Sequence, residues 1–291
     1  MNSIDIESKK FLGQPKNFVS IFNALLFDGQ PVLKPEYLKD ENSELVMNVS
    51  SKHVDIIKRY EDGTYLDLFV IESQSYVDQC MVARVMEYEC VARIRYIRQN
   101  FKKHVPMHTR LPMILTVVLY VGESKWNAAK RLSELEIIHP GFEDMFNEFK
   151  LNLIELNTNH KYNTGEKATQ DFFDLLRMIY RKQILKEDLD REFNRDALYF
   201  AYVVTKNKEL LNIYQESEKG DVKVCRALDE MFEESTNKGI QMGIKQGIEQ
   251  GIALNQFEVY QTMLDKGFSV KAIASIFSVS EESIKTLLMK A

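Results

Sequence analysis

The chain of 291 residues has only three cysteines, and their positions fit no common cysteine chemistry. Cys80, Cys90 and Cys225 make no CxxC pair, no zinc spacing and no paired disulfide framework. A small secreted scaffold held by disulfides is therefore excluded. We expect three buried thiols in a protein of the reducing cytoplasm.

Long apolar runs are also missing. No stretch approaches the roughly 20 apolar residues that cross a bilayer, and the first ten residues, MNSIDIESKK, are polar and acidic. We therefore expect neither a membrane span nor a signal peptide. The hydrophobic fraction of 45% is nevertheless that of a globular protein with a substantial core.

The motifs of several enzyme classes are absent. The five histidines are scattered along the chain, and the sequence contains no nucleophile elbow and no Walker-type glycine loop. Hydrolases that use a serine, cysteine or histidine nucleophile are therefore poorly supported.

The net charge of −5 argues weakly against an obligate nucleic-acid binder, because phosphate contacts require clustered cations. Two local clusters do exist, ARIRYIRQNFKKH at 92–104 and LLRMIYRKQILK at 175–186. Exposed basic helix faces are usually only solvated. The composition therefore leaves the partners of the protein open.

The first 120 residues predict helices and strands in alternation. Apolar residues at helical spacing precede Gly29 and predict a helix; they are Phe18, Ile21, Phe22, Leu25 and Leu26. The runs 52–60 and 65–73 predict strands, and the Asp-Gly dipeptide between them favours a hairpin.

A long helix is predicted over 75–103, with Met81, Val85, Tyr88 and Ala92 on one face. The apolar run at 113–122 then predicts a buried strand, which such a crossover makes parallel to the strand before it. A further strand is predicted at 150–157 and a further helix at 167–185. The segment from about 15 to 185 is therefore predicted to be α/β with a mixed sheet flanked by helices.

The remainder of the chain predicts helix with little strand, so we expect an all-α C-terminal region. Residues 239–254 repeat as GIQM, GIKQ, GIEQ and GIAL, with glycines at a spacing of four. Each helical glycine costs about 1 kcal/mol relative to alanine, so close packing should compensate. The repeat is either a helix that forms a homodimer or a flexible linker, and its charges exclude a membrane span.

The last residues predict two short helices around the SVS turn at 278–280, where serines can cap. A plain helical hairpin and a minimal helix-turn-helix both fit this pattern. The predicted domains are thus a core at 1–190, a helical extension at 191–238, and the glycine-repeat helix with a helical hairpin at 239–291.

The hairpin predicts a candidate site. If Asp62-Gly63 is a two-residue turn, Glu61 faces Thr64. In this register, the residue numbers of every facing pair add up to 125. Asp55 then faces Val70.

Side chains alternate along a strand, so this register places Asp55, Glu72 and Gln74 on one side of the sheet and Asp67 on the other. Two carboxylates that are diagonal neighbours can share a hard cation such as Mg²⁺. The alternative is a polar strand end that is merely hydrated.

The sequence has an aspartate in one predicted strand, then a turn, and then a glutamate two residues before the end of the next strand. This arrangement resembles the PD-(D/E)xK nuclease signature. The ordered blocks resemble the Rpn (recombination-promoting nuclease/putative transposase) family within that superfamily. They are NFVSIFNALLFDGQPVLKPEYL, VDIIKRY, LFVIESQSYVDQCMVARVMEYE and LTVVLYVGESKWNAAKRLSEL. The resemblance covers most of the chain and is strongest over 15–135.

The resemblance implies a restriction-endonuclease-like fold and an endonuclease that cleaves DNA with Mg²⁺, or Mn²⁺ as a substitute, in recombination or mobile-element biology. It implies that Asp55 and Glu72 hold the metal and that Gln74 occupies the usual lysine position as a third catalytic residue. Its supporting positions map onto Arg84 and Tyr88.

An acidic residue in the first helix is used by many nucleases of this superfamily; here Asn23 and Asp28 are the nearest candidates. Two other functions remain open. One is a catalytically weak DNA-binding or regulatory protein that keeps the nuclease fold. The other is an interaction module formed by the C-terminal helices.

Overall fold

The computed structural model of the protein describes residues 3–41, 56–63, 66–184, 188–217 and 220–290. The chain divides into two compact units, residues 1–229 and residues 230–291. Each unit is described by itself.

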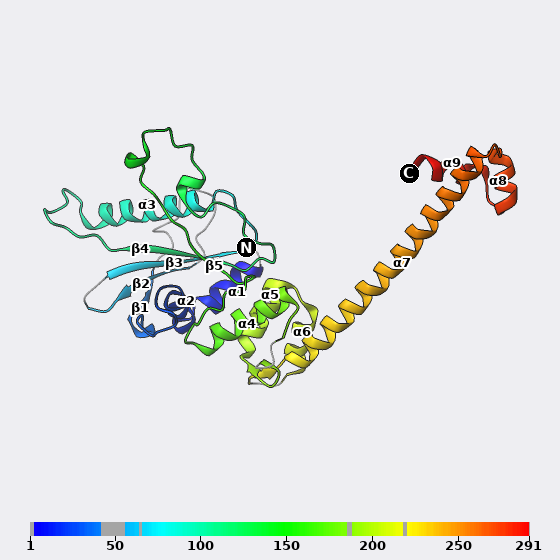
Figure 1. Cartoon of the computed structure of the whole chain (residues 1–291). Coiled ribbons are helices and arrows are strands. Elements are labelled where there is room, and N and C mark those ends of the chain that lie inside the picture. The colour runs from blue at the N-terminus through cyan, green and yellow to red at the C-terminus, as the bar shows by residue number, and fades with distance from the viewer. Residues whose placement is uncertain (1–2, 42–55, 64–65, 185–187, 218–219, 291) are drawn as a thin grey trace. The chain divides into compact units, whose positions relative to one another are not determined.

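The first unit is built on a five-stranded mixed sheet (Figure 1). Its strands are β1 (Leu38–Asp40), β2 (Ile56–Glu61), β3 (Leu66–Gln74), β4 (Ile114–Tyr120) and β5 (Asn152–Glu155). They lie side by side in sequence order. The first three pair antiparallel, and β3, β4 and β5 pair parallel. The predicted mixed α/β sheet is confirmed.

Helices cover both faces of this sheet (Figure 1). On one face lies α3 (Met81–Asn100), whose Tyr88 and Ala92 pack with Leu68 and Val70 of β3. On the other face lie α2 (Pro15–Phe27) and α4 (Lys167–Arg181). The strand β3 is therefore buried on both sides.

The apolar stripe predicted for α3 is confirmed, since Met81, Val85, Tyr88 and Ala92 are all buried. The helix begins at Met81 rather than at residue 75. The side chain of Asp78 accepts a hydrogen bond from the backbone N–H of Cys80 at 2.9 Å, which forms a turn before the first helical residue.

The predicted hairpin register is wrong by two residues. Facing residues of β2 and β3 have numbers that sum to 127, so Glu61 faces Leu66 and Val70 faces Ile57 rather than Asp55. The facing pairs are therefore centred between residues 63 and 64, one position later than the predicted turn at 62 and 63. An Asp-Gly dipeptide marks a turn but does not fix the length of the loop.

Glu72 and Asp67 still lie on the predicted sides of the sheet, because a shift of two residues leaves the alternation of side chains unchanged. Val70 packs toward α3, whereas the Phe69 ring lies 4.8 Å from that of Phe22 in α2. Glu72 therefore lies on the α3 side of the sheet and Asp67 on the α2 side.

The rest of the first unit consists of further helices, a small sheet and short 3₁₀ turns. Its elements are α1 (Ser3–Leu12), α5 (Arg195–Thr205), α6 (Lys208–Glu216), a two-stranded sheet of β6 (Glu192–Phe193) and β7 (Val222–Lys223), and short 3₁₀ turns at Pro35–Tyr37, Leu132–Glu134 and Glu143–Met145. The ring of Phe200 stacks 4.5 Å from Phe172 and lies 5.1 Å from Phe11. These rings join α1, α4 and α5.

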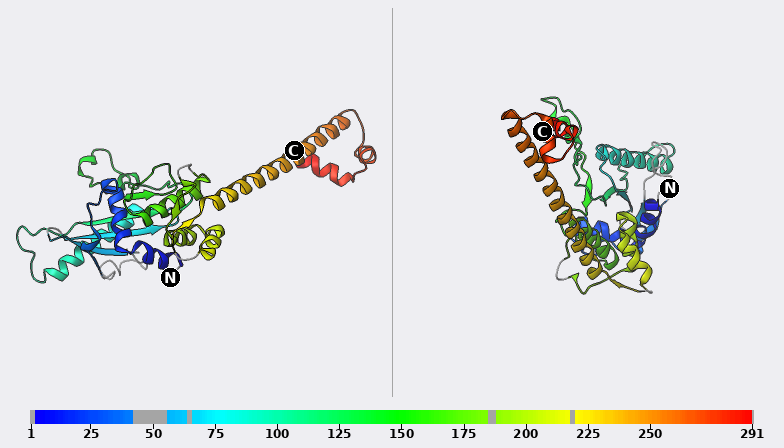
Figure 2. Two further views of the ribbon diagram at one scale, coloured as in Figure 1. Left: turned by 90° about the horizontal axis from the view of Figure 1, so that it is seen from below. Right: turned by 90° about the vertical axis from the view of Figure 1, so that its right-hand side faces the viewer.

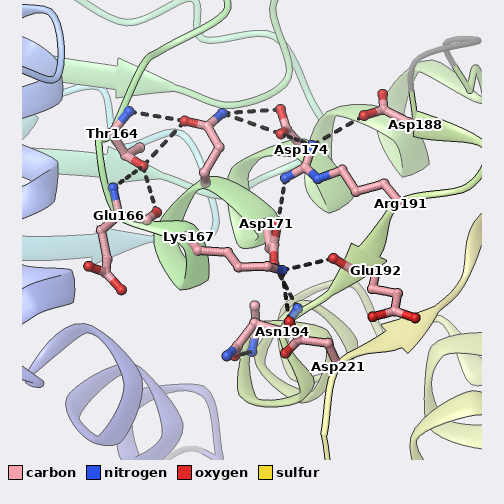
Figure 3. A network of polar contacts seen from close by, with 12 residues as sticks. Thr164, Glu166, Lys167, Asp171, Asp174, Asp188, Arg191, Glu192, Asn194 and Asp221 are labelled. Carbon is pink, nitrogen blue, oxygen red and sulfur yellow. Dashed lines mark hydrogen bonds and ion pairs between the residues drawn. The ribbon is translucent and has the colours of Figure 1, made fainter.

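A buried network of ion pairs joins α4 to the segment that follows it (Figure 3). Arg191 binds three carboxylates: Asp171, Asp174 at 2.7 Å and Asp188 at 3.1 Å. All three acids are almost completely buried. Burial and the charge of Asp174 raise the pKa of Asp188.

The network predicts that Arg191→Met lowers the free energy of unfolding by about 2 kcal/mol or more, because it leaves buried carboxylates without their main cation. Urea denaturation measures this. The matched control is Arg181→Met, an exposed arginine at the end of α4, for which we expect a change within about 0.5 kcal/mol. Equal stabilities of the two variants would show that the network is energetically neutral.

The second unit contains most of α7 (Cys225–Asp265), followed by α8 (Val270–Phe277) and α9 (Glu281–Lys290). Its core consists of Tyr260, Ile273, Ala274 and Ile284. The predicted serine caps are confirmed at Ser280, which accepts from the N–H of Ser283 at 3.1 Å. In the described ranges, no helix combines the length and the apolar character that a bilayer crossing requires.

Candidate functional site

The candidate site lies at the carboxyl end of β3. Glu72 and Gln74 are each only 4% exposed. They are buried because β4 pairs alongside, with Val118 next to Glu72 and Tyr120 next to Gln74. A carboxylate and an amide in such an interior position need polar partners.

Arg84 supplies a cation for Glu72. Because Glu72 lies on the α3 side of the sheet, the first turn of α3 carries the guanidinium to it, and Nη2 of Arg84 lies 3.1 Å from Oε1 of Glu72. Nη1 of Arg84 binds Oδ2 of Asp78 at 2.5 Å. One guanidinium thus joins two carboxylates.

Tyr88 completes this group, which we call the Arg84 cluster: Glu72, Asp78, Arg84 and Tyr88. The guanidinium of Arg84 donates to the Tyr88 hydroxyl at 2.8 Å from Nη2 and at 3.2 Å from Nε. This contact follows from the spacing of four on one helix, which places the two side chains on the same face. Arg84 and Tyr88 share one face of α3, as their spacing predicts, and Arg84 binds Glu72 directly.

The contacts within the Arg84 cluster favour a charged Arg84 and a neutral Tyr88. Burial lowers the pKa of Arg84, but its contacts with Asp78, Tyr88 and Glu72 outweigh burial and raise that pKa above its ordinary value. Burial and the charge of Glu72 raise the pKa of Tyr88, so its hydroxyl keeps its proton. Arg84 remains a cation at any physiological pH.

Gln74 is left with an unused donor. Its side-chain nitrogen Nε2 is buried and has no hydrogen-bond partner within the described part of the chain. A buried amide donor without a partner costs about 1–3 kcal/mol. An oxygen atom of a water molecule or of a substrate would satisfy it.

The other predicted residues are placed differently. Asp55 lies outside the described residues. Asn23 is buried in α2, and its amide makes two hydrogen bonds of 2.9 Å with the backbone of Leu33, which hold the segment after this helix. Asp28 is exposed and forms the left-handed C-cap of α2.

Sequence reasoning missed Asp78, the second carboxylate on Arg84. The sequence does contain an indication of this role, because Asp78 is an acidic residue just before the first apolar residue of a helix, where capping side chains usually lie. The helix predicted over 75–103 includes Asp78, however, so that prediction does not place this residue before the first turn, where the structure has it.

Carboxylates alone do not form a complete metal site in the described part of the structure. There, no group of three or more histidine, cysteine, aspartate or glutamate residues could hold a metal ion. Glu72 is the buried carboxylate at the end of β3, and Arg84 is the cation that binds it. Any further acidic ligand has to come from elsewhere in the chain.

The Arg84 cluster predicts that Arg84→Met lowers the free energy of unfolding by about 2–4 kcal/mol, because it leaves buried Glu72 without its cation. Chemical denaturation measures the decrease. Arg98→Met, an exposed position on the same helix, is the matched control and should change little.

A second variant separates charge from packing. Glu72→Gln combined with Arg84→Met should be more stable than Arg84→Met alone, because the amide carries no charge to compensate. The contrary outcome is that Glu72→Gln lowers the free energy of unfolding by the same amount in the Arg84→Met variant as in the wild type. The two residues would then not be coupled.

The comparison with protein-family models identifies one family over residues 36–210, described as "Putative transposase, YhgA-like". Comparisons with curated proteins and with solved structures found no match. The matched residues make up more than half of the chain and include all of the Arg84 cluster. The family is of the Rpn, PD-(D/E)xK type, so the resemblance inferred from the sequence blocks is confirmed. The chain therefore belongs to the YhgA-like transposase family.

Proposed function

We propose that the protein is a metal-dependent endonuclease that hydrolyses phosphodiester bonds of DNA, with a restriction-endonuclease-like core. The observation that carries this proposal is the end of β3. A buried carboxylate, Glu72, and a buried amide, Gln74, whose donor has no partner in the described structure, stand two residues apart in a family of the PD-(D/E)xK type. A link to recombination or mobile elements follows from the family.

Glu72 and Asp55 are the proposed ligands of Mg²⁺, for which Mn²⁺ can substitute. Carboxylate oxygens suit this cation, which needs only one or two of them beside its waters. Asp55 precedes Ile56, which pairs with Ile71, the residue before Glu72. When bound, the cation would activate a water molecule and stabilise the negative charge that develops on the phosphate.

The side chains around Glu72 have separate roles in this proposal. Nε2 of Gln74 donates a hydrogen bond to the attacking water or to an oxygen of the scissile phosphate. Arg84 binds Oε1 of Glu72 and fixes the orientation of this carboxylate. Tyr88 holds the guanidinium of Arg84 in place.

Nicking of supercoiled plasmid in Mg²⁺ tests the proposal. Asp55→Asn and Glu72→Gln should each lower the rate by about a hundredfold or more, because each removes a metal ligand. Asp67→Asn is the matched control: it lies on the other face of the sheet, and an amide oxygen can still accept the hydrogen bond from the N–H of Met113.

Thermal denaturation provides a readout besides cleavage. Mg²⁺ should raise the melting temperature of the wild type and of Asp67→Asn, but not that of Glu72→Gln. A folded wild type that neither cleaves DNA nor is stabilised by Mg²⁺ or Mn²⁺ would overturn the proposal. The catalytically weak DNA-binding or regulatory protein would then be the better explanation, and Gln74 in the lysine position would favour it.

We also propose that the glycine repeat forms a homodimer. The 41-residue helix α7 contains all four glycines of the repeat, Gly239, Gly243, Gly247 and Gly251. Apart from the backbone of the helix itself, no atom of the described structure lies within 4 Å of the position that a Cβ atom would occupy on any of these glycines. The neighbouring isoleucines, 240, 244, 248 and 252, are each more than half exposed. A second copy of this helix would cover the isoleucines and use the space above the glycines.

The charge of the second unit favours a protein partner over DNA. Residues 230–291 contain eight acidic residues, six lysines and no arginine. Helix α9, which would enter the groove in a helix-turn-helix, begins with Glu281 and Glu282. Two carboxylates at this position would repel phosphates.

Light scattering after size exclusion tests the dimer. The wild type should have twice the mass of one chain, and Ile244→Lys with Ile248→Lys should convert it to a monomer, because two lysines would be buried in the interface. The control is Ile137→Lys with Met145→Lys, two exposed apolar positions in the first unit. A monomeric wild type at micromolar concentration would contradict the dimer.

A further inference from the structure

The chain is acidic overall, but one long segment has no acidic residue. Between Glu89 and Glu123 the sequence contains six lysines and arginines, two histidines and not a single carboxylate side chain. The cations gather at the end of α3 and in the loop 101–113 that connects it to β4. We call the four outermost ones, Arg98, Lys102, Lys103 and Arg110, the basic tip.

The basic tip is exposed and has no acidic partner. All four side chains are exposed to solvent. Among the described residues no ion pair joins any of them to a carboxylate, whereas Arg93, one turn earlier, binds Glu89 at 3.0 Å. Attraction to the negative end of the helix dipole explains Arg98 in the last turn. It does not explain Arg110, ten residues beyond the helix.

The loop that carries these cations is anchored at both ends. The N–H of Phe101 donates to the carbonyl of Ile97 at the end of α3. At the other end, Met113 accepts from the N–H of Leu68 at 2.9 Å and donates to the side chain of Asp67 at 3.1 Å. The loop extends beyond the strands in two views (Figures 1 and 2).

The geometry points to a function for this surface: we propose that the basic tip binds the phosphate backbone of duplex DNA and positions it along α3. Two arginines and two lysines without internal partners provide the clustered cations that phosphates require. This inference rests on the proposed function and adds to it a second contact with the substrate.

The length of α3 fixes the spacing of the two contacts. Fourteen residues separate Arg84, beside Glu72, from Arg98, which is about 21 Å along a helix axis. The same length of B-DNA contains about six base pairs. Cleavage beside Glu72 and phosphate contacts at the basic tip would therefore lie about half a helical turn of DNA apart.

The test is fluorescence anisotropy of a labelled 30-base-pair duplex in EDTA, over a series of salt concentrations, so that cleavage plays no part. In the variant Arg98→Gln, Lys102→Gln, Lys103→Gln, Arg110→Gln we expect the affinity to fall about tenfold or further. The slope of log affinity against log salt should become shallower by about 0.9 for each phosphate that the variant no longer binds.

The control removes four positive charges elsewhere: Lys16→Gln, Lys150→Gln, Arg181→Gln, Lys208→Gln, all exposed. It has the same net charge as the basic-tip variant. If both variants bind equally weakly, only net charge matters, and the proposal is overturned. Melting temperatures equal to the wild type show that both variants are folded.

The basic tip and the nuclease can fail separately. If the wild type cleaves plasmid but the basic-tip variant binds like the control, the basic tip fails while the nuclease stands. If the wild type binds DNA through the basic tip without cleaving it, the nuclease fails while the basic tip stands. The last experiment is sedimentation with vesicles of phosphatidylserine and phosphatidylcholine. If the basic tip binds these vesicles and not DNA, it is a membrane-binding surface, and the proposal is overturned.

Discussion

The structure of the candidate site depends on the burial of one charge. Glu72 lies at the carboxyl end of a strand that is covered on both faces, where an isolated carboxylate is costly. Arg84 offsets this cost, and Arg84 in turn is held by Asp78 and Tyr88. The start of α3 is therefore fixed by the same contacts that orient Glu72.

This constraint connects the fold to the chemistry. In the proposed nuclease, the contact with Arg84 would orient the carboxylate of Glu72 before a cation binds. The donor of Gln74, which has no partner among the described residues, fits the same proposal, because a bound ligand is one explanation of an unsatisfied buried group. The site and the basic tip lie near opposite ends of α3, so this helix would set the distance between cleavage and binding.

The two units use charge in different ways. In the first unit, buried carboxylates are matched by arginines, both around Arg84 and around Arg191. The second unit has no arginine, and α7 exposes isoleucines beside glycines. A helix with four glycines is costly by itself, and close contact with another helix would compensate that cost.

Local patterns in the sequence determined the order of the main elements of the core, from α2 through β2, β3, α3, β4 and β5 to α4. They also determined the family and the side of the sheet on which Glu72 and Asp67 lie. These depend on alternation and periodicity, which a shift of register by two residues does not alter. The register itself, the start of α3 and the partners of Arg84 were decided by tertiary structure. A dipeptide does not fix the length of a loop, and Asp78 acquires its role only when α3 packs against β3 and brings the guanidinium of Arg84 to both carboxylates.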